Sequence, residues 1–520
     1  MFLKSPLAGQ LQQALVARKD QLDSWLDDWW YDAYCEIRGP LVPYLSLASI
    51  QPRAPRAIGS QICRAADSIY HMLKVWESLR KQTYPVMKSR GVIWDMNQNL
   101  CLFNAARVPQ RPKDQMARYF KTEEQGACPS HIVILCRGNI WELDVMKNGA
   151  LKSVDELYRA FEFVRNNSTK VRHSVATLTT EHRDTWADMR THLQKLSSKN
   201  AENLLKIESS IFAVVLTDDE ILEENELLVY SMMGQPDGQW ADKNMNISIM
   251  KDGQITTQAD HSNVDAIVVL DAGNISGRKI RHHVWTPNDN ADFEKPTLIN
   301  FEFGQNCRKS DRRSRKEFLQ ASMQIAFRRV HGSYAPIYET ASTRKFYLGR
   351  TETIRSRTPE AVAFINALLE SRPVDELRHL FKAAYDAHNR LMAEAMEGNG
   401  CDRHLYGLRK TLESMNKGSC NPKRGEPKIF QDKAWKHSGG DGNFKLSTSF
   451  IGYDKFGSYG YVSAMCPDGY GSFYRIHDDG MLLTASNFTS GASNLDEYTK
   501  NIAWAMDRIG EVLGVHQAKL

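Results

Sequence analysis

The chain has 520 residues, more than one compact core usually holds, so we expect two large lobes. Its 42% hydrophobic and 25% charged residues are typical of a soluble globular protein, and a net charge of +5 gives no reason to expect a nucleic-acid partner. Nine scattered cysteines without a Cys-x-x-Cys pair argue against a secreted disulfide framework and a structural zinc site, and they favour a reducing compartment.

The N-terminal region is predicted to be helical. Leucines and tryptophans recur at helical spacing between residues 11 and 29, and a second helical pattern covers 62–79. Residues 1–20 lack the long apolar core of a signal peptide, and no apolar run in the chain is long enough to cross a bilayer. We therefore expect a protein with no membrane span.

Strands are predicted in the middle of the chain. Residues 131–136 form a short apolar run typical of a buried strand, whereas 185–211 has a helical pattern. The turn Asp252-Gly253 between two alternating segments predicts a hairpin that leads to His261. Residues 266–270 are predicted to be another buried strand, so His261 is placed in the short connection before it.

The second half of the chain alternates between helices and strands. Residues 271–295 are polar and predict a surface connection between lobes, and a basic run at 308–316 precedes a predicted helix. Thr358 and Pro359 mark another helix start, and a final helix is predicted at 495–513. The whole pattern is mixed α/β. We assign residues 1–295 to an N-terminal lobe and 296–520 to a C-terminal lobe.

His261 is the first candidate for chemistry. It lies in Ala-Asp-His-Ser-Asn-Val-Asp at 259–265, with a carboxylate on either side. A histidine in such a connection can act as a general base whose tautomer is fixed by a neighbour. A polar loop histidine without a catalytic role has the same local sequence, and the residues alone leave both interpretations open.

Four further segments carry groups that suit an anionic ligand. Residues 338–356 are rich in hydroxyls and arginines, and Arg403 adds another basic side chain. Ser-Thr-Ser at 447–449 offers donors to a developing oxyanion, and the basic run at 308–316 lies ahead of a helix N-terminus, which attracts phosphate. Each segment also has an ordinary explanation as a turn, a surface ion pair or a solvated charged face.

Together and in this order, these segments resemble the choline/carnitine acyltransferase family. The resemblance covers nearly the whole chain, including Leu-Asp-Asp-Trp-Trp at 26–30, Asp-Met-Asn-Gln at 95–98, Leu-Thr-Thr-Glu-His-Arg at 178–183 and Trp-Ala-Asp-Lys at 240–243. It implies an α/β fold of two CoA-dependent acyltransferase-like lobes, with mixed sheets flanked by helices and an active-site tunnel between them. It also implies reversible acyl transfer between CoA and L-carnitine by direct attack.

The resemblance assigns roles to the matching positions. His261 is expected to take the proton from the carnitine hydroxyl, and Ser449 to donate to the oxyanion. The expected contacts of the carnitine carboxylate are Tyr338, Thr351, Arg403 and Ser447, and those of the CoA 3′-phosphate are Lys309 and Arg313. Asp265 matches an acidic position whose role we leave open. Acyl-CoA is expected as a co-substrate, with no prosthetic group and no metal.

Within the family, the chain is most similar to the branch that transfers medium-chain, octanoyl-like groups. Gly460 matches a position where short-chain relatives carry a methionine that blocks the acyl tunnel. The alternative is that Gly460 only shapes a turn, since Gly457 lies close by. The rival functions are a short-chain carnitine acetyltransferase and a catalytically impaired relative that binds acyl-CoA or carnitine. A choline acetyltransferase has no need of the carboxylate contacts.

The chain ends in Ala518-Lys519-Leu520, a variant of the Ser-Lys-Leu peroxisomal address. We therefore expect binding to the import receptor and a peroxisomal location, with a cytoplasmic one as the alternative. The resemblance also implies a monomer. In comparison with the family, an N-terminal segment is absent, and the connection 271–303 is shorter and is expected to lack a helix.

Overall fold

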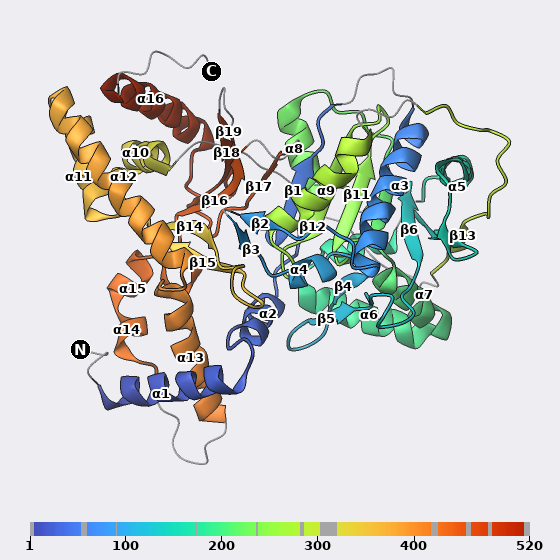
Figure 1. The fold of residues 1–520 in the computed structure, drawn as a ribbon, viewed down its shortest axis with the longest axis horizontal. Coiled ribbons are helices and arrows are strands. Elements are labelled where there is room, and N and C mark those ends of the chain that lie inside the picture. Colours follow the sequence, from blue (N-terminus) through green and yellow to red (C-terminus); the bar gives the residue numbers. More distant parts are fainter. Residues whose placement is uncertain are drawn as a thin grey trace.

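Two mixed β-sheets, each covered by helices, form the part of the chain that the computed structural model describes (Figure 1). The described residues are 5–53, 60–89, 91–171, 174–235, 238–280, 285–301, 320–417, 425–453, 459–476 and 481–513. This architecture confirms the predicted α/β class with two lobes of mixed sheets flanked by helices. None of the described helices is both long enough and apolar enough to cross a membrane.

The first sheet has eight strands, in the order β13 (Thr297–Ile299), β7 (Asn139–Asp144), β6 (His131–Cys136), β10 (Ala213–Leu216), β11 (Met245–Ile249), β12 (Ile255–Asp260), β1 (Ser46–Ile50) and β17 (Tyr459–Tyr461). The central strands β6, β10 and β11 are parallel. The near-continuous apolar sequences of β6 and β10 are typical of strands that are buried on both faces, whereas polar residues alternate with apolar ones in β11. The antiparallel β11–β12 hairpin turns at Gly253, whose φ is +81°, and confirms the predicted hairpin.

Helices cover both faces of this sheet. On one face lie α3 (Gln61–Arg80), α5 (Val154–Asn167) and α9 (Ala266–Ile280), which pack against alternate side chains such as Ile134. The other face, which carries Leu135, is covered by η3 (Val175–Thr180), α6 (Arg183–Leu196) and α7 (Ser198–Ser209). Successive residues of a strand point to opposite faces, so both layers draw on the same strands.

The segment that follows His261 is a helix. Residues 266–270, which the sequence predicted as a buried strand, form the first turn of α9 (Ala266–Ile280), so that prediction was wrong. The helix also extends into 271–295, where no helix was expected. Val268 and Val269 are buried in the core of the first sheet and Leu270 is buried against Phe473, and a run of five apolar residues fits a buried helix as well as a strand.

The second sheet has five strands, in the order β15 (Thr351–Ile354), β14 (Ile337–Ser342), β16 (Leu446–Tyr453), β18 (Tyr470–Ile476) and β19 (Met481–Ser486). Its main helices are α10 (Gln320–His331), α11 (Pro359–Leu369), α12 (Val374–Met396), α13 (Asp402–Lys417) and α16 (Leu495–Leu513). The helix start at Thr358 is confirmed, because its hydroxyl accepts a hydrogen bond from the Ala361 amide at 3.1 Å. The final helix has the predicted bounds.

Several elements lie outside the lobe in which the sequence placed them. β13 and β17, from the predicted C-terminal lobe, join the first sheet, where β17 pairs with β1. Conversely, α1 (Pro6–Gln21) packs against α13 through Leu11, Leu15, Leu408 and Leu412. α2 (Asp27–Cys35) follows α1 and lies between the two sheets in Figure 1. The division at residue 295 stays a prediction, and the chain crosses between the sheets at both ends.

Candidate active site

His261 lies in the loop that joins β12 to α9. Its backbone amide donates to the Leu45 carbonyl at 2.9 Å, and its ring Nδ1 is 2.9 Å from the Val264 carbonyl oxygen. A carbonyl only accepts hydrogen bonds, so Nδ1 carries the proton and Nε2 is left as the acceptor. The side chain is 34% exposed, so a substrate can reach it. Burial lowers the pKa of His261 most, although Asp265 raises it.

Asp265 holds the loop through Arg350 and does not contact the ring closely. Arg350 donates to the Asp265 carboxylate at 3.0 Å, and to the carbonyls of Ser262 and His261 at 2.8 and 2.9 Å. The nearest approach of Asp265 to His261 Nδ1 is 3.9 Å, too long for a hydrogen bond. Burial alone raises the pKa of Asp265, but Arg350 outweighs it and lowers the pKa to about 2. The carboxylate is therefore ionised throughout the neutral range.

Three of the residues expected to bind carboxylate meet at one point. Arg403, in the first turn of α13, donates to Thr351 Oγ1 at 3.2 Å and to the Tyr338 hydroxyl at 3.4 Å. It also donates to the Thr351 carbonyl at 2.9 Å, which fixes its guanidinium on the end of β15. Ser447 of β16 pairs with Tyr338 of β14 in register, so their side chains point to the same face of the sheet.

Ser449 lies two residues beyond Ser447 on β16 and is half-buried. Because side chains alternate along a strand, Ser449 projects from the same face as Ser447 and Tyr338. The structure therefore brings Ser447, Tyr338, Thr351 and Arg403 together, and it places Ser449 one step further along the same row. Lys309, Arg313 and the terminal Ala518-Lys519-Leu520 lie outside the described residues.

Two aromatic residues of α2 join this site to His261, and the sequence assigned neither of them a role. The Arg403 guanidinium lies 4.1 Å from the Trp30 ring centroid, and the Trp30 ring is 5.9 Å from that of Tyr34. Tyr34 in turn lies 5.5 Å from the His261 ring. Trp30 and Tyr34 thus form an aromatic wall that extends from the Arg403 guanidinium to the His261 imidazole. The density of aromatics at 25–34 was the only local signal of it.

Gly460 lies within strand β17, so the alternative of a turn glycine is wrong. It pairs with Ser49 of β1, and a Cβ at this position would lie 2.3 Å from the Ala48 carbonyl oxygen and 3.3 Å from the Phe473 ring. Phe473 packs in turn against Leu270 of α9, the helix that starts just after His261. Gly460 therefore allows β17 to pack closely against β1 and the Phe473 ring.

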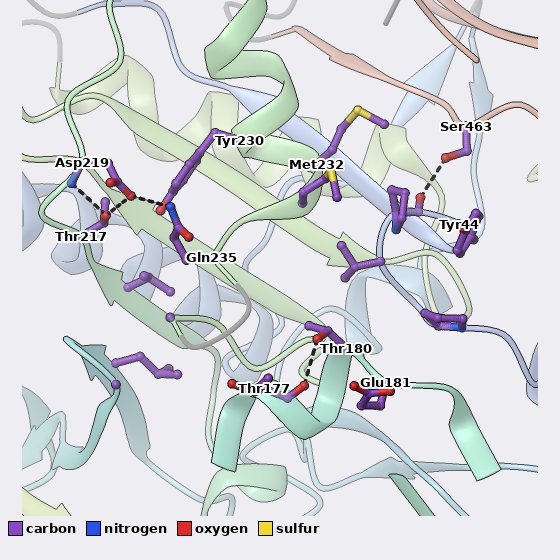
Figure 2. A pocket seen from close by; sticks show the side chains of 18 of the residues that line it. Tyr44, Thr177, Thr180, Glu181, Thr217, Asp219, Tyr230, Met232, Gln235 and Ser463 are labelled. Atoms are coloured by element: carbon purple, nitrogen blue, oxygen red, sulfur yellow. Dashed lines mark hydrogen bonds between the residues drawn. The ribbon is translucent and has the colours of Figure 1, made fainter. Parts of the chain in front are cut away.

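A cavity of about 1120 Å³ lies elsewhere, on the side of β17 that faces Met232 (Figure 2). Met232 of α8 (Glu224–Met233), Glu181 after η3 and Ser463 after β17 line it. Met232 packs with Tyr461, whose side chain projects from the face of β17 opposite to the one on which a Cβ of its neighbour Gly460 would stand. The cavity contains none of the predicted site residues. Within the described ranges, no cluster of three or more His, Cys, Asp or Glu side chains is arranged to hold a metal ion.

Comparison with known proteins shows which family the chain belongs to. The family model described as choline/carnitine O-acyltransferase matches residues 1–314 and 288–504. Peroxisomal carnitine O-octanoyltransferase of Rattus norvegicus is 32% identical over 92% of this chain and 85% of its own length, and the Homo sapiens protein of that name is 31% identical over 94% and 86%. Carnitine O-acetyltransferase of Mus musculus is 27% identical over 93% and 82%. The chain therefore belongs to the choline/carnitine acyltransferase family.

Proposed function

We propose that the chain transfers a medium-chain acyl group reversibly between CoA and L-carnitine, with His261 as the general base. The observation that carries this proposal is the fixed tautomer of His261, whose free Nε2 is joined by an aromatic wall to the basic group around Arg403. A neutral imidazole accepts a proton, and a buried arginine with hydroxyl neighbours binds a carboxylate. Carnitine carries both an alcohol and a carboxylate.

The reaction is a direct displacement. Arg403, Tyr338, Thr351 and Ser447 hold the carnitine carboxylate and so orient its hydroxyl toward Nε2 of His261. The hydroxyl oxygen attacks the thioester carbonyl while Nε2 takes its proton, and the carbonyl oxygen becomes an oxyanion that accepts a hydrogen bond from Ser449. When the tetrahedral species collapses, the C–S bond breaks and the CoA thiolate takes the proton back from the imidazolium.

Asp265 and Arg350 support this step without touching the substrate. Arg350 fixes the backbone on both sides of the imidazole, at the carbonyls of His261 and Ser262. The Asp265 carboxylate, 3.9 Å from Nδ1, stabilises the imidazolium that forms during the reaction. Asp265 is thus assigned the role that the sequence left open: it anchors Arg350 and provides the counter-charge.

The octanoyl preference rests on Gly460 and on relatives that are named for this substrate. Gly460 lies against Phe473, which packs on Leu270 of α9 close to the His261 loop, and we place the acyl chain of the thioester beside this contact. Each methylene buried there contributes about 0.8 kcal/mol. Carnitine acetyltransferases are related at lower identity, so acetyl transfer is the alternative.

Binding of the CoA 3′-phosphate is assigned to Lys309 and Arg313, and a peroxisomal location to the terminal Ala518-Lys519-Leu520, which the import receptor reads. The relatives named peroxisomal support this location. We propose that the enzyme acts as a monomer on its two substrates, with no prosthetic group.

The test is thiol release by the purified full-length chain with L-carnitine and a series of acyl-CoA substrates from acetyl to palmitoyl. We expect the highest kcat/KM with octanoyl-CoA, and no turnover by His261→Ala although acyl-CoA still binds. A maximum at acetyl-CoA would support the acetyltransferase instead. Acyl-CoA binding without turnover by the wild-type chain would support a non-catalytic relative.

A further inference from the structure

Two motifs of the family resemblance have no role in this reaction, namely 178–183 and 240–243. In the structure they meet in a buried charge cluster, by which we mean Asp242, Arg183, Asp114 and Arg107; the partly exposed Arg38 also pairs with Asp114, at 2.8 Å. The side chains of Arg107, Asp114 and Arg183 are fully inaccessible to solvent, and that of Asp242 is 3% exposed. Charged side chains are almost never buried this completely unless they are paired, so we ask what these pairs hold in place.

The buried charge cluster is a continuous chain of ion pairs. Arg183 donates to Asp242 and to Asp114, both at 2.6 Å, and Arg107 donates through Nε to the same Asp114 oxygen at 2.7 Å. Burial alone raises the pKa of Asp114, but Arg183 and Arg107 outweigh it and lower that pKa. Asp114 is therefore ionised in the neutral range and fixes one edge of the Arg107 guanidinium. Burial raises the pKa of Asp242 to about 6 despite its pair with Arg183.

The other edge of Arg107 points to the active site. Its Nη1 donates to Ser262 Oγ at 2.9 Å, and its Nη2 donates to the Tyr34 carbonyl at 2.7 Å. Ser262 follows His261 directly, and Tyr34 is the ring that lies beside the imidazole. A single rigid guanidinium thus joins the loop of the base to the aromatic wall of α2. Its planar fork of donors holds both partners at a fixed separation.

Ser262 transmits this restraint to both sides of His261. While its hydroxyl accepts from Arg107, it donates to Asp260 Oδ1 at 2.9 Å, and its backbone amide donates to the same oxygen at 3.2 Å. Asp260 and Ser262 are the two neighbours of His261 in the chain. Together with Arg350, which holds the carbonyls, Arg107 leaves the loop little freedom to move the imidazole.

Stability alone is a poor account of the cluster, because apolar residues of similar volume usually stabilise a core at least as well as buried ion pairs do. We propose that Arg107, held by the buried charge cluster, is a positioning residue that fixes His261 relative to the aromatic wall. It thereby sets the distance between the base and the acceptor hydroxyl. This inference rests on the proposed function. A displacement of about 1 Å in such a site costs on the order of 100-fold in rate.

The test compares Ser262→Ala and Arg107→Lys with the wild-type chain in steady-state kinetics, well below the Tm of each variant. Both changes leave the substrate contacts intact. We expect kcat to fall roughly 10- to 100-fold in each variant, while KM for acyl-CoA stays within about twofold. Ser262→Ala keeps every ion pair of Asp114, so it tests the inference even if Arg107→Lys fails to fold. A wild-type kcat in Ser262→Ala would overturn it.

The double variant separates positioning from a general loss of structure. If Arg107 acts on His261 through Ser262, adding Ser262→Ala to Arg107→Lys lowers kcat little further. If the fold-losses in kcat of the two single variants multiply in the double variant, the inference is contradicted. Arg190→Lys is the matched control. Arg190 forms an ion pair with Glu208, and the two side chains are only 13% and 7% exposed. Within the described part of the chain, neither side chain forms a hydrogen bond or ion pair with a proposed site residue. We expect Arg190→Lys to lower the Tm and leave kcat unchanged.

Failure of the inference can be told apart from failure of the proposed function. If His261→Ala is inactive while Ser262→Ala and Arg107→Lys have the wild-type kcat, only the positioning role of Arg107 is wrong. If His261→Ala retains activity, the assignment of the base is wrong, whatever the other variants do.

Discussion

At the scale of single residues, proton transfer at His261 depends on two charged neighbours with opposite effects. Burial lowers the pKa of His261 below its ordinary value of 6.5, Asp265 raises it, and Arg350 lowers it. The ring is therefore neutral at neutral pH, which a general base requires. The acidic limb of the pH–rate profile for acyl transfer to carnitine follows this pKa and has its midpoint below pH 6.5.

Asp265→Asn should move this limb to lower pH. The carboxylate favours the protonated ring, so its removal lowers the pKa of His261 further, and the neutral base persists in more acidic solution. At the same time kcat at the plateau falls, because the imidazolium loses its counter-charge and Arg350 loses its anchor. The measurement is kcat/KM between about pH 5 and 8. A limb that moves to higher pH would contradict this electrostatic assignment.

Choice of the acceptor depends on Arg403 and Thr351. Arg403→Asn combined with Thr351→Val removes the charge and one hydroxyl from the carboxylate site, which costs about 2–5 kcal/mol. We expect kcat/KM for carnitine to fall roughly 30- to 5000-fold at that cost, while the low rate with choline changes little. Arg409→Asn is the control, since Arg409 lies on α13 but pairs with Asp441 and Glu426 at the surface. Unchanged carnitine kinetics in the double variant would remove both residues from the site.

At the scale of elements, the sequence predicted hairpins and helix ends well, because these depend on local chemistry. The turn at Gly253 and the cap at Thr358 are such cases. It failed at 266–270, where a short apolar run has no periodicity that separates a helix from a strand. It also missed Trp30 and Arg350, whose roles come from contacts with residues far away in the chain.

The pairing of β17 with β1 allows a sharper test of which acyl chain length the enzyme prefers. A Cβ at residue 460 meets the Ala48 carbonyl at 2.3 Å, so any substitution disturbs this pairing to some degree. Gly460→Ala carries that disturbance alone, whereas Gly460→Met adds a long side chain beside Phe473. We therefore expect Gly460→Met to lose octanoyl transfer by at least about tenfold more than Gly460→Ala, while both retain similar acetyl transfer.

Acetyl- and octanoyl-CoA kinetics of the two variants decide between the roles of this glycine. If Gly460→Ala and Gly460→Met lose both activities equally, the glycine only allows the close approach of β17 to β1. An undiminished octanoyl preference in Gly460→Met would mean that the acyl chain lies elsewhere. Circular dichroism and Tm of both variants show whether the strand pairing survived.

At the scale of the whole molecule, the site is assembled from both sheets, and the N-terminal segment connects its parts. α1 packs against α13, whose first turn carries Arg403, and α2 carries Trp30 next to Arg403 and Tyr34 beside His261. The Tyr406 hydroxyl on α13 donates to the Trp29 carbonyl at 2.7 Å. α1 and α2 therefore contribute, together with Arg350, to how the carboxylate site of one sheet lies relative to the base on the other.

Leu11→Ala tests this connection. Leu11 is fully buried between α1 and α13, and its truncation typically costs about 2–5 kcal/mol of packing. Because α13 carries Arg403 and α1 leads into α2 with Trp30, we expect KM for carnitine to rise several-fold while KM for acyl-CoA stays unchanged. Leu157→Ala in α5 is the matched control, since it removes the same volume from a fully buried site in the core of the first sheet. That variant should lose stability, measured as Tm, without a selective effect on carnitine. Equal KM changes in both variants would show that α1 contributes only to general stability.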